Sequence, residues 1–178
     1  MKESALSLRN RALLLLNSSC SEDVVAHSIA VSINSLSIAR KIRRKGYTVD
    51  LEFVEVAALL HDIGRSRTHG IKHGIEGAEI LRREGLGQFS RVCETHIGGG
   101  ITRKEAMKMG LPKRDYLPET LEEKIIAHAD NITWGTETVP VEKTIEKLRG
   151  RLGADHPAIN RVRELSRFIK QLTGDELT

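Results

Sequence analysis

Three of the chain's seven histidines lie in one short stretch, HDIGRSRTHGIKHGIEGAEIL, which spans residues 61–81. These are His61, His69 and His73, and Asp62 follows the first of them directly. Imidazole and carboxylate are side chains that proteins use to bind divalent metals. We therefore ask whether the elements around this stretch bring further histidines and carboxylates to the same place.

Further histidines and a carboxylate fall on apolar faces of segments with helical periodicity. In segment 87–97, His96 shares an inward stripe with apolar residues, whereas Arg91 and Glu94 are predicted to face away. The same spacing places His27 and Asp130 on inward faces of two other helices. A single inward histidine is usually a core residue whose ring nitrogens are hydrogen-bonded within the protein. Several buried imidazoles and carboxylates together cost too much desolvation unless a cation binds them, so the pattern predicts a divalent metal.

The elements that position these side chains are predicted to be helices, because almost every segment has helical rather than alternating periodicity. N-cap residues, capping boxes and terminal glycines set the expected bounds. The predicted helices are 4–17, one from Ser21 to before Gly46, one opened by Asp50, then 74–84, 87–97, 103–109, one within 117–135, one from Pro140 to near Gly153, and one starting at Asp155 or His156. The fold class is therefore all-α.

Length and composition indicate one compact domain. The net charge is only +4, the basic residues are dispersed and aromatic residues make up 3% of the chain, which makes a dedicated nucleic-acid binder unlikely on these grounds. The longest N-terminal apolar run, 12–16, is far too short for a membrane span. Two scattered cysteines, Cys20 and Cys93, do not form a disulfide framework. We expect a cytoplasmic protein that does not act at a membrane.

The order His27, then His61-Asp62, then Asp130 resembles the H…HD…D signature of the HD-domain metal-dependent phosphohydrolase superfamily. HDIG is a common form of its central motif, and the resemblance covers about residues 23–135. It implies a compact HD-domain helical bundle in which 1–178 form a single domain, with helices of 140–175 packing on the core.

By this resemblance, one metal is held by His27, His61, Asp62 and Asp130. Members with two metals add two histidines, and His73 and His96 hold the matching places. Asp62 would then bridge the ions, and Asp62, His73 and His96 would form the catalytic centre. The cofactor would be one or two divalent ions of Mn, Fe, Co, Ni, Mg or Zn.

Two histidines leave the ligand assignment open or fall outside it. His69 competes with His73, since spacing alone does not choose between them; the HGIEGA segment favours His73. His128 lies two residues before Asp130, so on a helix it points to a nearly opposite side and cannot share the ion. His156 precedes a proline and is predicted to cap a helix at the surface.

The chemistry implied is hydrolysis of a phosphate ester or anhydride by metal-activated water. A phosphate also needs positive charge and N–H donors. Arg65 and His69 are candidates, as is the loop GGGIT with the helix start after it. A plain turn between helices explains those glycines at least as well. The loop candidates are Gly99, Gly100, Thr102 and Arg103.

The expected partner is a small phosphorylated substrate, with a nucleotide favoured, and a homo-oligomer stays open. There is no HHE or GYP sequence, which argues against the cyclic-dinucleotide phosphodiesterases of the HD-GYP kind. Two alternatives remain. Inositol-oxygenase-type relatives use the same ligand order for di-iron oxygen chemistry, and a non-catalytic ligand-binding HD module would keep the fold without the reaction.

Overall fold

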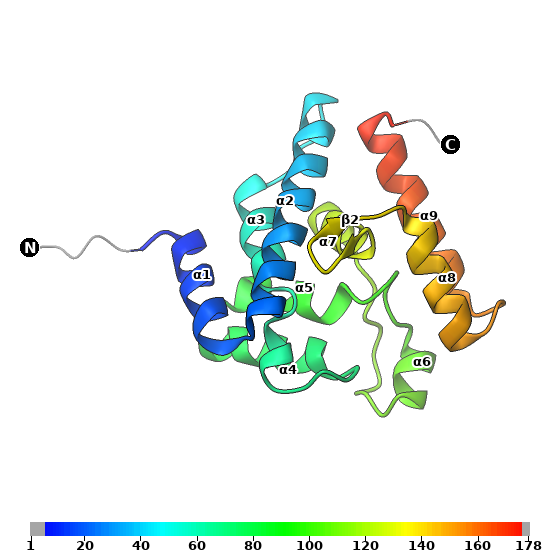
Figure 1. The fold of residues 1–178 in the computed structure, drawn as a ribbon, viewed down its shortest axis with the longest axis horizontal. Helices are drawn as coiled ribbons and strands as arrows, with labels where there is room; N and C mark the ends of the chain where they lie inside the picture. Colours follow the sequence, from blue (N-terminus) through cyan, green and yellow to red (C-terminus); the bar gives the residue numbers. More distant parts are fainter. Residues whose placement is uncertain (1–5, 176–178) are drawn as a thin grey trace, which may run out of the picture.

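The structure, a computed structural model, describes residues 6–175 and is built almost entirely of helices (Figure 1). The elements in chain order are α1 (Leu8–Ser19), α2 (Glu22–Arg44), α3 (Leu51–Leu60), the 3₁₀ turn η1 (Ile63–Ser66), α4 (His73–Arg83), η2 (Gly87–Phe89), α5 (Ser90–Thr95), α6 (Arg103–Lys108), α7 (Leu121–Asn131), β1 (Thr133–Trp134), β2 (Glu137–Thr138), α8 (Val141–Leu152) and α9 (Pro157–Thr173). The all-α class is confirmed. Within residues 6–175, no helix combines the length and the apolar character that crossing a bilayer requires.

Predicted helix starts agree with the caps that the structure shows. The Asp50 side chain accepts a hydrogen bond from the backbone N–H of Phe53, and Thr102 and Glu105 form a complete capping box at α6. His156 caps α9 through its ring, as expected, ahead of the proline at the first helical position. The first predicted helix began at residue 4; residues 4 and 5 lie outside the described part of the chain, and α1 begins at Leu8.

Two segments differ from the prediction. Segment 87–97 is not one helix, because η2 precedes a short α5 and His96 is its C-cap. Glu94 does not face away: its side chain is 4% exposed and contacts Arg82 and Arg114 at 2.9 and 2.8 Å, so paired cations pay for its burial. The helix predicted within 117–135 ends at Asn131, and the segment after it turns back as an antiparallel β1–β2 hairpin.

The long helix α2 lies at the centre of the molecule with α3 and α7, while α1 lies on one side and α8 and α9 on the other (Figure 1). The main apolar core fills the space between the central helices and includes Val31, Val54, Leu60 and Ile126, all 0% exposed. A smaller apolar cluster joins α8 to α9. This core fixes the ends of α2, α3 and α7 that carry His27, His61 and Asp130.

Three glycines let η1, α4 and α5 approach at backbone distance. A Cβ on Gly64 would overlap the carbonyl oxygen of His73 and lie 2.5 Å from the Gly77 nitrogen. A Cβ on Gly74 would lie 2.5 Å from the carbonyl oxygen of Cys93, and one on Gly77 would lie 3.1 Å from the Cys93 sulfur. The glycines of HDIG and HGIEGA therefore permit the close packing that brings Asp62, His73 and His96 together.

Candidate metal centre

Six side chains from five segments of the chain converge at one end of the central helices. They are His27 from α2, His61 and Asp62 at the end of α3, His73 from α4, His96 after α5 and Asp130 from α7. The ligand atoms of His27, His61 and Asp130 lie within 4.8 Å of one another, and so do those of His61, Asp62 and His96. The structure thus brings together every residue of the H…HD…D pattern and both additional histidines.

The two oxygens of Asp62 face two different groups of histidines. Its Oδ1 lies 3.2 Å from Nε2 of His73 and 3.4 Å from Nε2 of His96. Its Oδ2 lies on the other side, 3.8 Å from Nε2 of His61 and 4.0 Å from Nε2 of His27. Asp130 completes the second group, because its Oδ1 is 3.0 Å from His27 Nε2. This is the arrangement that a carboxylate shared by two cation sites requires.

Backbone carbonyls fix the orientation of all four imidazoles. Nδ1 of His27 donates to Gly135 at 2.9 Å, and the Nδ1 atoms of His61, His73 and His96 donate to carbonyl oxygens three residues earlier at 2.7, 2.8 and 2.9 Å. Because a carbonyl oxygen only accepts, each Nδ1 carries the hydrogen and each Nε2 is turned towards the carboxylates. Metal-binding histidines in proteins are usually held in this way by their second ring nitrogen.

The charges of the cluster favour a cation. Burial would lower the pKa of His61, but Asp62 and Asp130 raise it to about 9. Burial would raise the pKa of Asp62, yet His61 and the neighbouring imidazoles hold it well below its ordinary value. The pKa of Asp130 is likewise lowered, despite burial, by the hydrogen bond with His27 and by the nearby His61 imidazole. Both carboxylates are therefore ionised at neutral pH, and their field attracts positive charge.

Two buried atoms of the cluster test whether the residues fit a metal. Among the described residues, His61 Nε2 and Asp62 Oδ1 find no hydrogen-bond partner of good geometry, although both are fully shielded from solvent. Unpartnered buried nitrogen and oxygen atoms are rare, and they are expected where a bound ion completes the environment. The set of imidazole and carboxylate donors suits a divalent transition metal. The cluster therefore fits a metal-binding centre.

One side of the cluster opens into a cleft of about 450 Å³. Arg65, which follows HDIG, lines this cleft with a side chain 31% exposed, and its Nε makes an ion pair with Asp62. Asp130, with a side chain 21% exposed, also lines it, so the predicted inward carboxylate stands at the base of an opening rather than in the core. A ligand in this cleft would meet the cluster and the Arg65 guanidinium together.

Several residues of this cleft, which come from the hairpin and from α8, were not predicted from the sequence. Trp134 and Gly135 line the opening beside Thr144 and Lys147. The indole N–H of Trp134 donates to Thr144 at 3.0 Å, and the Lys147 ammonium lies 5.2 Å from the ring centroid. The one available signal was Trp134, the only tryptophan of the chain. No spacing pattern connects Lys147 to the ligands.

The structure places the other predicted binding residues elsewhere. His69 is an exposed residue of the loop before α4, whereas His73 lies in the cluster. Gly99 lies in a hollow beside Arg161, where a Cβ would lie 2.7 Å from the arginine backbone, and Gly100 packs on Tyr116 and its neighbour. The triple glycine thus has a packing role against α9.

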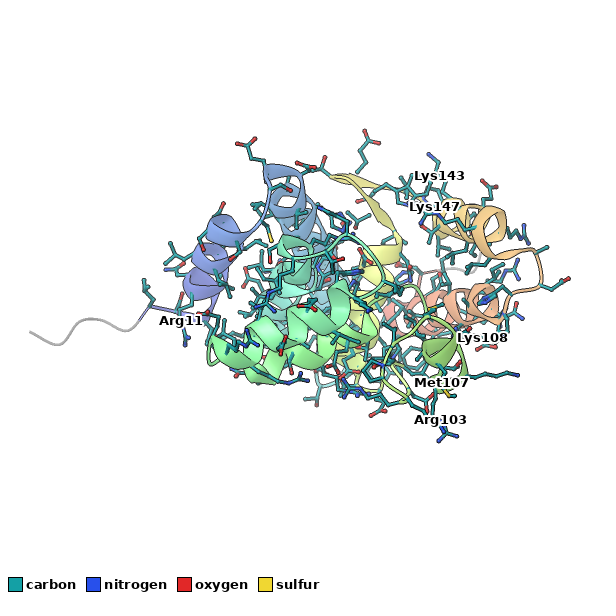
Figure 2. The ribbon with its side chains drawn as sticks, turned by 90° about the horizontal axis from the view of Figure 1, so that it is seen from below. Arg11, Arg103, Met107, Lys108, Lys143 and Lys147 are labelled. Atoms are coloured by element: carbon teal, nitrogen blue, oxygen red, sulfur yellow. The ribbon has the colours of Figure 1, made fainter. Side chains whose placement is uncertain are left out.

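The helix start after that loop is already engaged by the protein itself. Thr102 and Glu105 satisfy each other's donors and acceptors in the capping box, and the Arg103 backbone N–H donates to Asp115 at 2.6 Å. Figure 2 shows Arg103 on α6, separated from Lys147 on α8. None of Gly99, Gly100, Thr102 and Arg103 is among the described residues that line the 450 Å³ cleft.

His128 points away from the cluster, as its spacing predicts. It is 6% exposed and lines a different hollow, between α7 and α9. Asn131, next to Asp130 on α7, donates to the carbonyl oxygen of Gly98 at 2.9 Å and so ties the end of α7 to the segment that follows His96. One helix therefore serves the metal centre with one face and a second hollow with another.

Fold and cluster together define a helical protein with a cluster of histidines and aspartates that could hold a metal ion. Comparison with known families gives the class its name. The chain matches the HD domain family over residues 24–135, and an uncharacterized protein of Methanocaldococcus jannaschii is 52% identical over 163 residues, covering 91% of this chain and 96% of the relative. The chain belongs to the HD domain family.

Other relatives carry the name tRNA (cytidine(56)-2′-O)-methyltransferase. The protein of Thermoplasma volcanium is 37% identical over 92% of this chain, and that of Picrophilus torridus is 41% identical over 72%. The matches cover only 47% and 37% of these proteins, so this chain spans about half or less of their length.

Two solved structures share the fold. Both are of the HD domain of the phosphodiesterase PgpH from L. monocytogenes, and one of them is a complex with cyclic-di-AMP. The TM-scores are 0.53 and 0.55, with sequence identities of 21% and 19%, over 92% and 94% of this chain and 97% and 98% of theirs. This likeness confirms the predicted HD-domain bundle.

Proposed function

We propose that this chain is a cytoplasmic metal-dependent phosphohydrolase that acts on a nucleotide or another small phosphorylated metabolite. The observation that carries the proposal is Asp62, whose two oxygens face two groups of imidazoles beneath a cleft that also holds Arg65 and Lys147. In the reaction, a water oxygen would bond to phosphorus, the P–O bond to the leaving group would break, and the leaving oxygen would take up a proton.

The ligands support a two-ion centre. His27, His61 and Asp130 with one oxygen of Asp62 would hold one ion, and the remaining two histidines with its other oxygen would hold the second. Bound divalent ions lower the pKa of water to near neutrality and stabilise charge on phosphoryl oxygens. The candidate ions are Mn, Fe, Co, Ni and Zn, which accept imidazole and carboxylate donors, and Mg, which would need additional oxygen ligands.

Two cations of the cleft would position the phosphate. The Nε of Arg65 contacts Asp62, which leaves the terminal guanidinium nitrogens for phosphate oxygens. Lys147 lines the same cleft from α8, where Figure 2 labels it. These charges favour phosphate hydrolysis over the di-iron oxygenase alternative, which needs no such anion site. Arg65→Ala should raise the Michaelis constant, and an unchanged value would contradict this role.

Trp134 supports a nucleotide among the possible substrates. Its ring is 39% exposed on the rim of the cleft and is fixed in place by the hydrogen bond to Thr144. Stacking of a base on such a ring contributes about 1–3 kcal/mol. The cyclic-di-AMP complex of a protein with the same fold agrees with this substrate class. We expect Trp134→Ala to weaken the binding of nucleotides about tenfold, a change within that range. The affinity for ribose 5-phosphate, which has no base, should stay unchanged.

Metal analysis followed by phosphate release would test the function. The purified protein is assayed by elemental analysis and then, with added Mn²⁺, against nucleoside 2′-, 3′- and 5′-monophosphates, nucleoside triphosphates, sugar phosphates and cyclic-di-AMP. His73→Ala should bind less metal and release phosphate more slowly, while His69→Ala, a matched change at an exposed histidine, should leave both unchanged. Equal effects of the two changes would contradict the assignment. Oxygen uptake by the iron-loaded protein without phosphate release would favour the oxygenase.

A further inference from the structure

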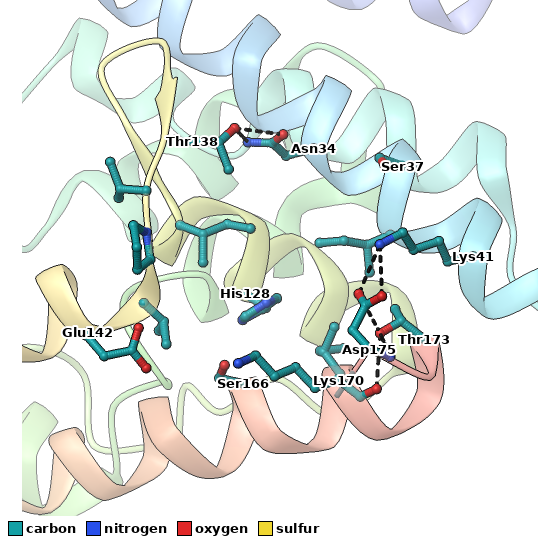
Figure 3. Close-up of a pocket in the computed structure, with 16 residues that line it drawn as sticks. Asn34, Ser37, Lys41, His128, Thr138, Glu142, Ser166, Lys170, Thr173 and Asp175 are labelled. Carbon is teal, nitrogen blue, oxygen red and sulfur yellow. Dashed lines mark hydrogen bonds and ion pairs between the residues drawn. The ribbon is translucent and has the colours of Figure 1, made fainter. Parts of the chain in front are cut away.

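A second hollow lies on the face of α7 away from the metal centre. It has a volume of about 420 Å³ and lies between α2, α7, the start of α8 and α9 (Figure 3). We call it the α7–α9 pocket. His128 projects into it from α7, two residues before Asp130, which faces the cleft. The two hollows therefore share a helix but none of the same side chains.

His128 has a buried ring nitrogen that nothing in the described protein satisfies. The residue is 6% exposed, and its Nδ1 is shielded from solvent without a hydrogen-bond partner within residues 6–175. Leaving a buried polar atom unpaired costs about 1–3 kcal/mol. A ligand that hydrogen-bonds the ring would remove this cost, and the pocket gives such a ligand room.

The charged and polar groups around His128 favour an anion. Lys170 lines the pocket from α9, and among the described residues its ammonium pairs with no carboxylate. Figure 3 shows Lys170 beside Ser166, on the α9 side below His128. Lys41 at the other end is already paired with Asp175 at 2.9 Å. The Lys170 ammonium, the Ser166 hydroxyl and the unpaired His128 nitrogen thus border the same pocket, the first two from α9 and the third from α7.

The rest of the pocket is largely apolar. Ile38, Ile132 and Ile169 line it together with Val139 and Pro140. Such walls add affinity only for a ligand with apolar surface, because burying that surface is favourable by roughly 25 cal/mol per Å². Glu142 also lines the pocket, from the start of α8, and disfavours negative charge beside its carboxylate. The anionic group is therefore placed between Lys170 and His128.

We propose that the α7–α9 pocket binds a small organic anion, with its phosphate or carboxylate group on Lys170, Ser166 and His128 and its apolar part against the isoleucines. The site is independent of the proposed hydrolysis, because it uses no metal ligand.

Histidine ring NMR with phenylphosphonate tests this inference. The probe carries an apolar ring and a phosphonate that is not hydrolysed, and the protein is loaded with diamagnetic Zn²⁺. The ring ¹⁵N signals of His128 are identified as those that disappear in His128→Gln. We expect these signals to shift saturably as phenylphosphonate is added. Inorganic phosphate should bind more weakly than phenylphosphonate. Equal affinity for inorganic phosphate would contradict an organic ligand.

Two lysine variants complete the test. Lys170→Met should weaken phenylphosphonate at least about tenfold, the loss expected for a charged hydrogen bond. Lys108→Met, a matched change on the exposed face of α6, should leave the affinity unchanged. If the His128 signals stay constant while those of the cluster histidines shift, the anion binds at the metal centre alone and the inference is overturned. Equal affinity of Lys170→Met and the wild type for phenylphosphonate would overturn it as well.

Discussion

Replacing Gly64 of the HDIG motif by alanine should disrupt the metal centre without touching a ligand. The added Cβ would overlap the carbonyl oxygen of His73 and lie 2.5 Å from the backbone nitrogen of Gly77. Both atoms belong to the α4 backbone, so no side-chain rotation relieves the contact. The first turn of α4 must therefore move away from η1, and His73 moves with it.

The structure gives an approximate size for this effect. Overpacking a filled interior by one methyl costs about 1–3 kcal/mol, and contact with backbone on two sides places Gly64→Ala at the upper end, about 3 kcal/mol. For a protein of this length the midpoint of thermal unfolding falls by about 2–4 °C per kcal/mol, so a loss of roughly 6–12 °C is expected. The variant should also bind less metal, because Asp62 and His73 no longer share one side of the centre.

Gly70→Ala supplies the matched control. Gly70 lies in the loop between η1 and α4, and a Cβ there would meet only the Thr68 hydroxyl, at an ordinary 3.6 Å. The free energy of unfolding of Gly70→Ala should differ from that of the wild type by less than about 1 kcal/mol. Both variants are unfolded thermally with chelator present and then analysed for bound metal without it. If Gly64→Ala unfolds at the same temperature as Gly70→Ala and binds the same metal, close backbone packing does not position His73.

Three further results are expected. Burial lowers the pKa of His128 to about 4, so between pH 6.5 and 4 only the unfolded chain takes up this proton. The free energy of unfolding should therefore fall by up to about 3 kcal/mol over that interval. In urea titrations His128→Gln should lack this part of the loss, and the same pH dependence in the variant and the wild type would contradict the prediction. Glu105→Gln removes the negative charge that pairs with Arg161 at 2.8 and 2.7 Å and replaces one of the two accepting oxygens by an amide donor. It should cost about 1–3 kcal/mol by chemical denaturation, whereas the same change at the exposed Glu146 should cost almost nothing. Mn²⁺ at 100 times its dissociation constant should stabilise the chain by about 2.7 kcal/mol in thermal unfolding, and Asp62→Ala should abolish this shift.

The sequence was sufficient to predict the direction of His27, His61 and His96 because helical periodicity relates spacing to direction, whereas His73 was predicted from the family resemblance. His96 falls on its apolar stripe, and the predicted N-caps fix where α3, α6 and α9 begin. The motif and the periodicity agreed on His27, His61 and Asp130, which all come from regular helices or their ends. Where the backbone is regular, position along the chain predicts orientation.

Tertiary packing decided what the sequence could not show. Glu94 is buried because Arg82 and Arg114 arrive from other segments, and neither is predicted by the period of α5. The triple glycine looked suited to phosphate, but its space is taken by α9 around Arg161. Lys147 reaches the cleft only because α8 docks beside the hairpin. Each of these contacts depends on how distant segments meet, which local patterns do not encode.

The two-sided placement of Asp62 gives the proposed centre an uneven tolerance to mutation. Losing His73 or His96 would remove donors from one half and leave His27, His61 and Asp130 with an oxygen of Asp62. Losing Asp62 would take a donor from both halves at once. A descendant that works with one ion would therefore arise by drift at either of those two histidines, while the aspartate could not be exchanged without ending the chemistry altogether.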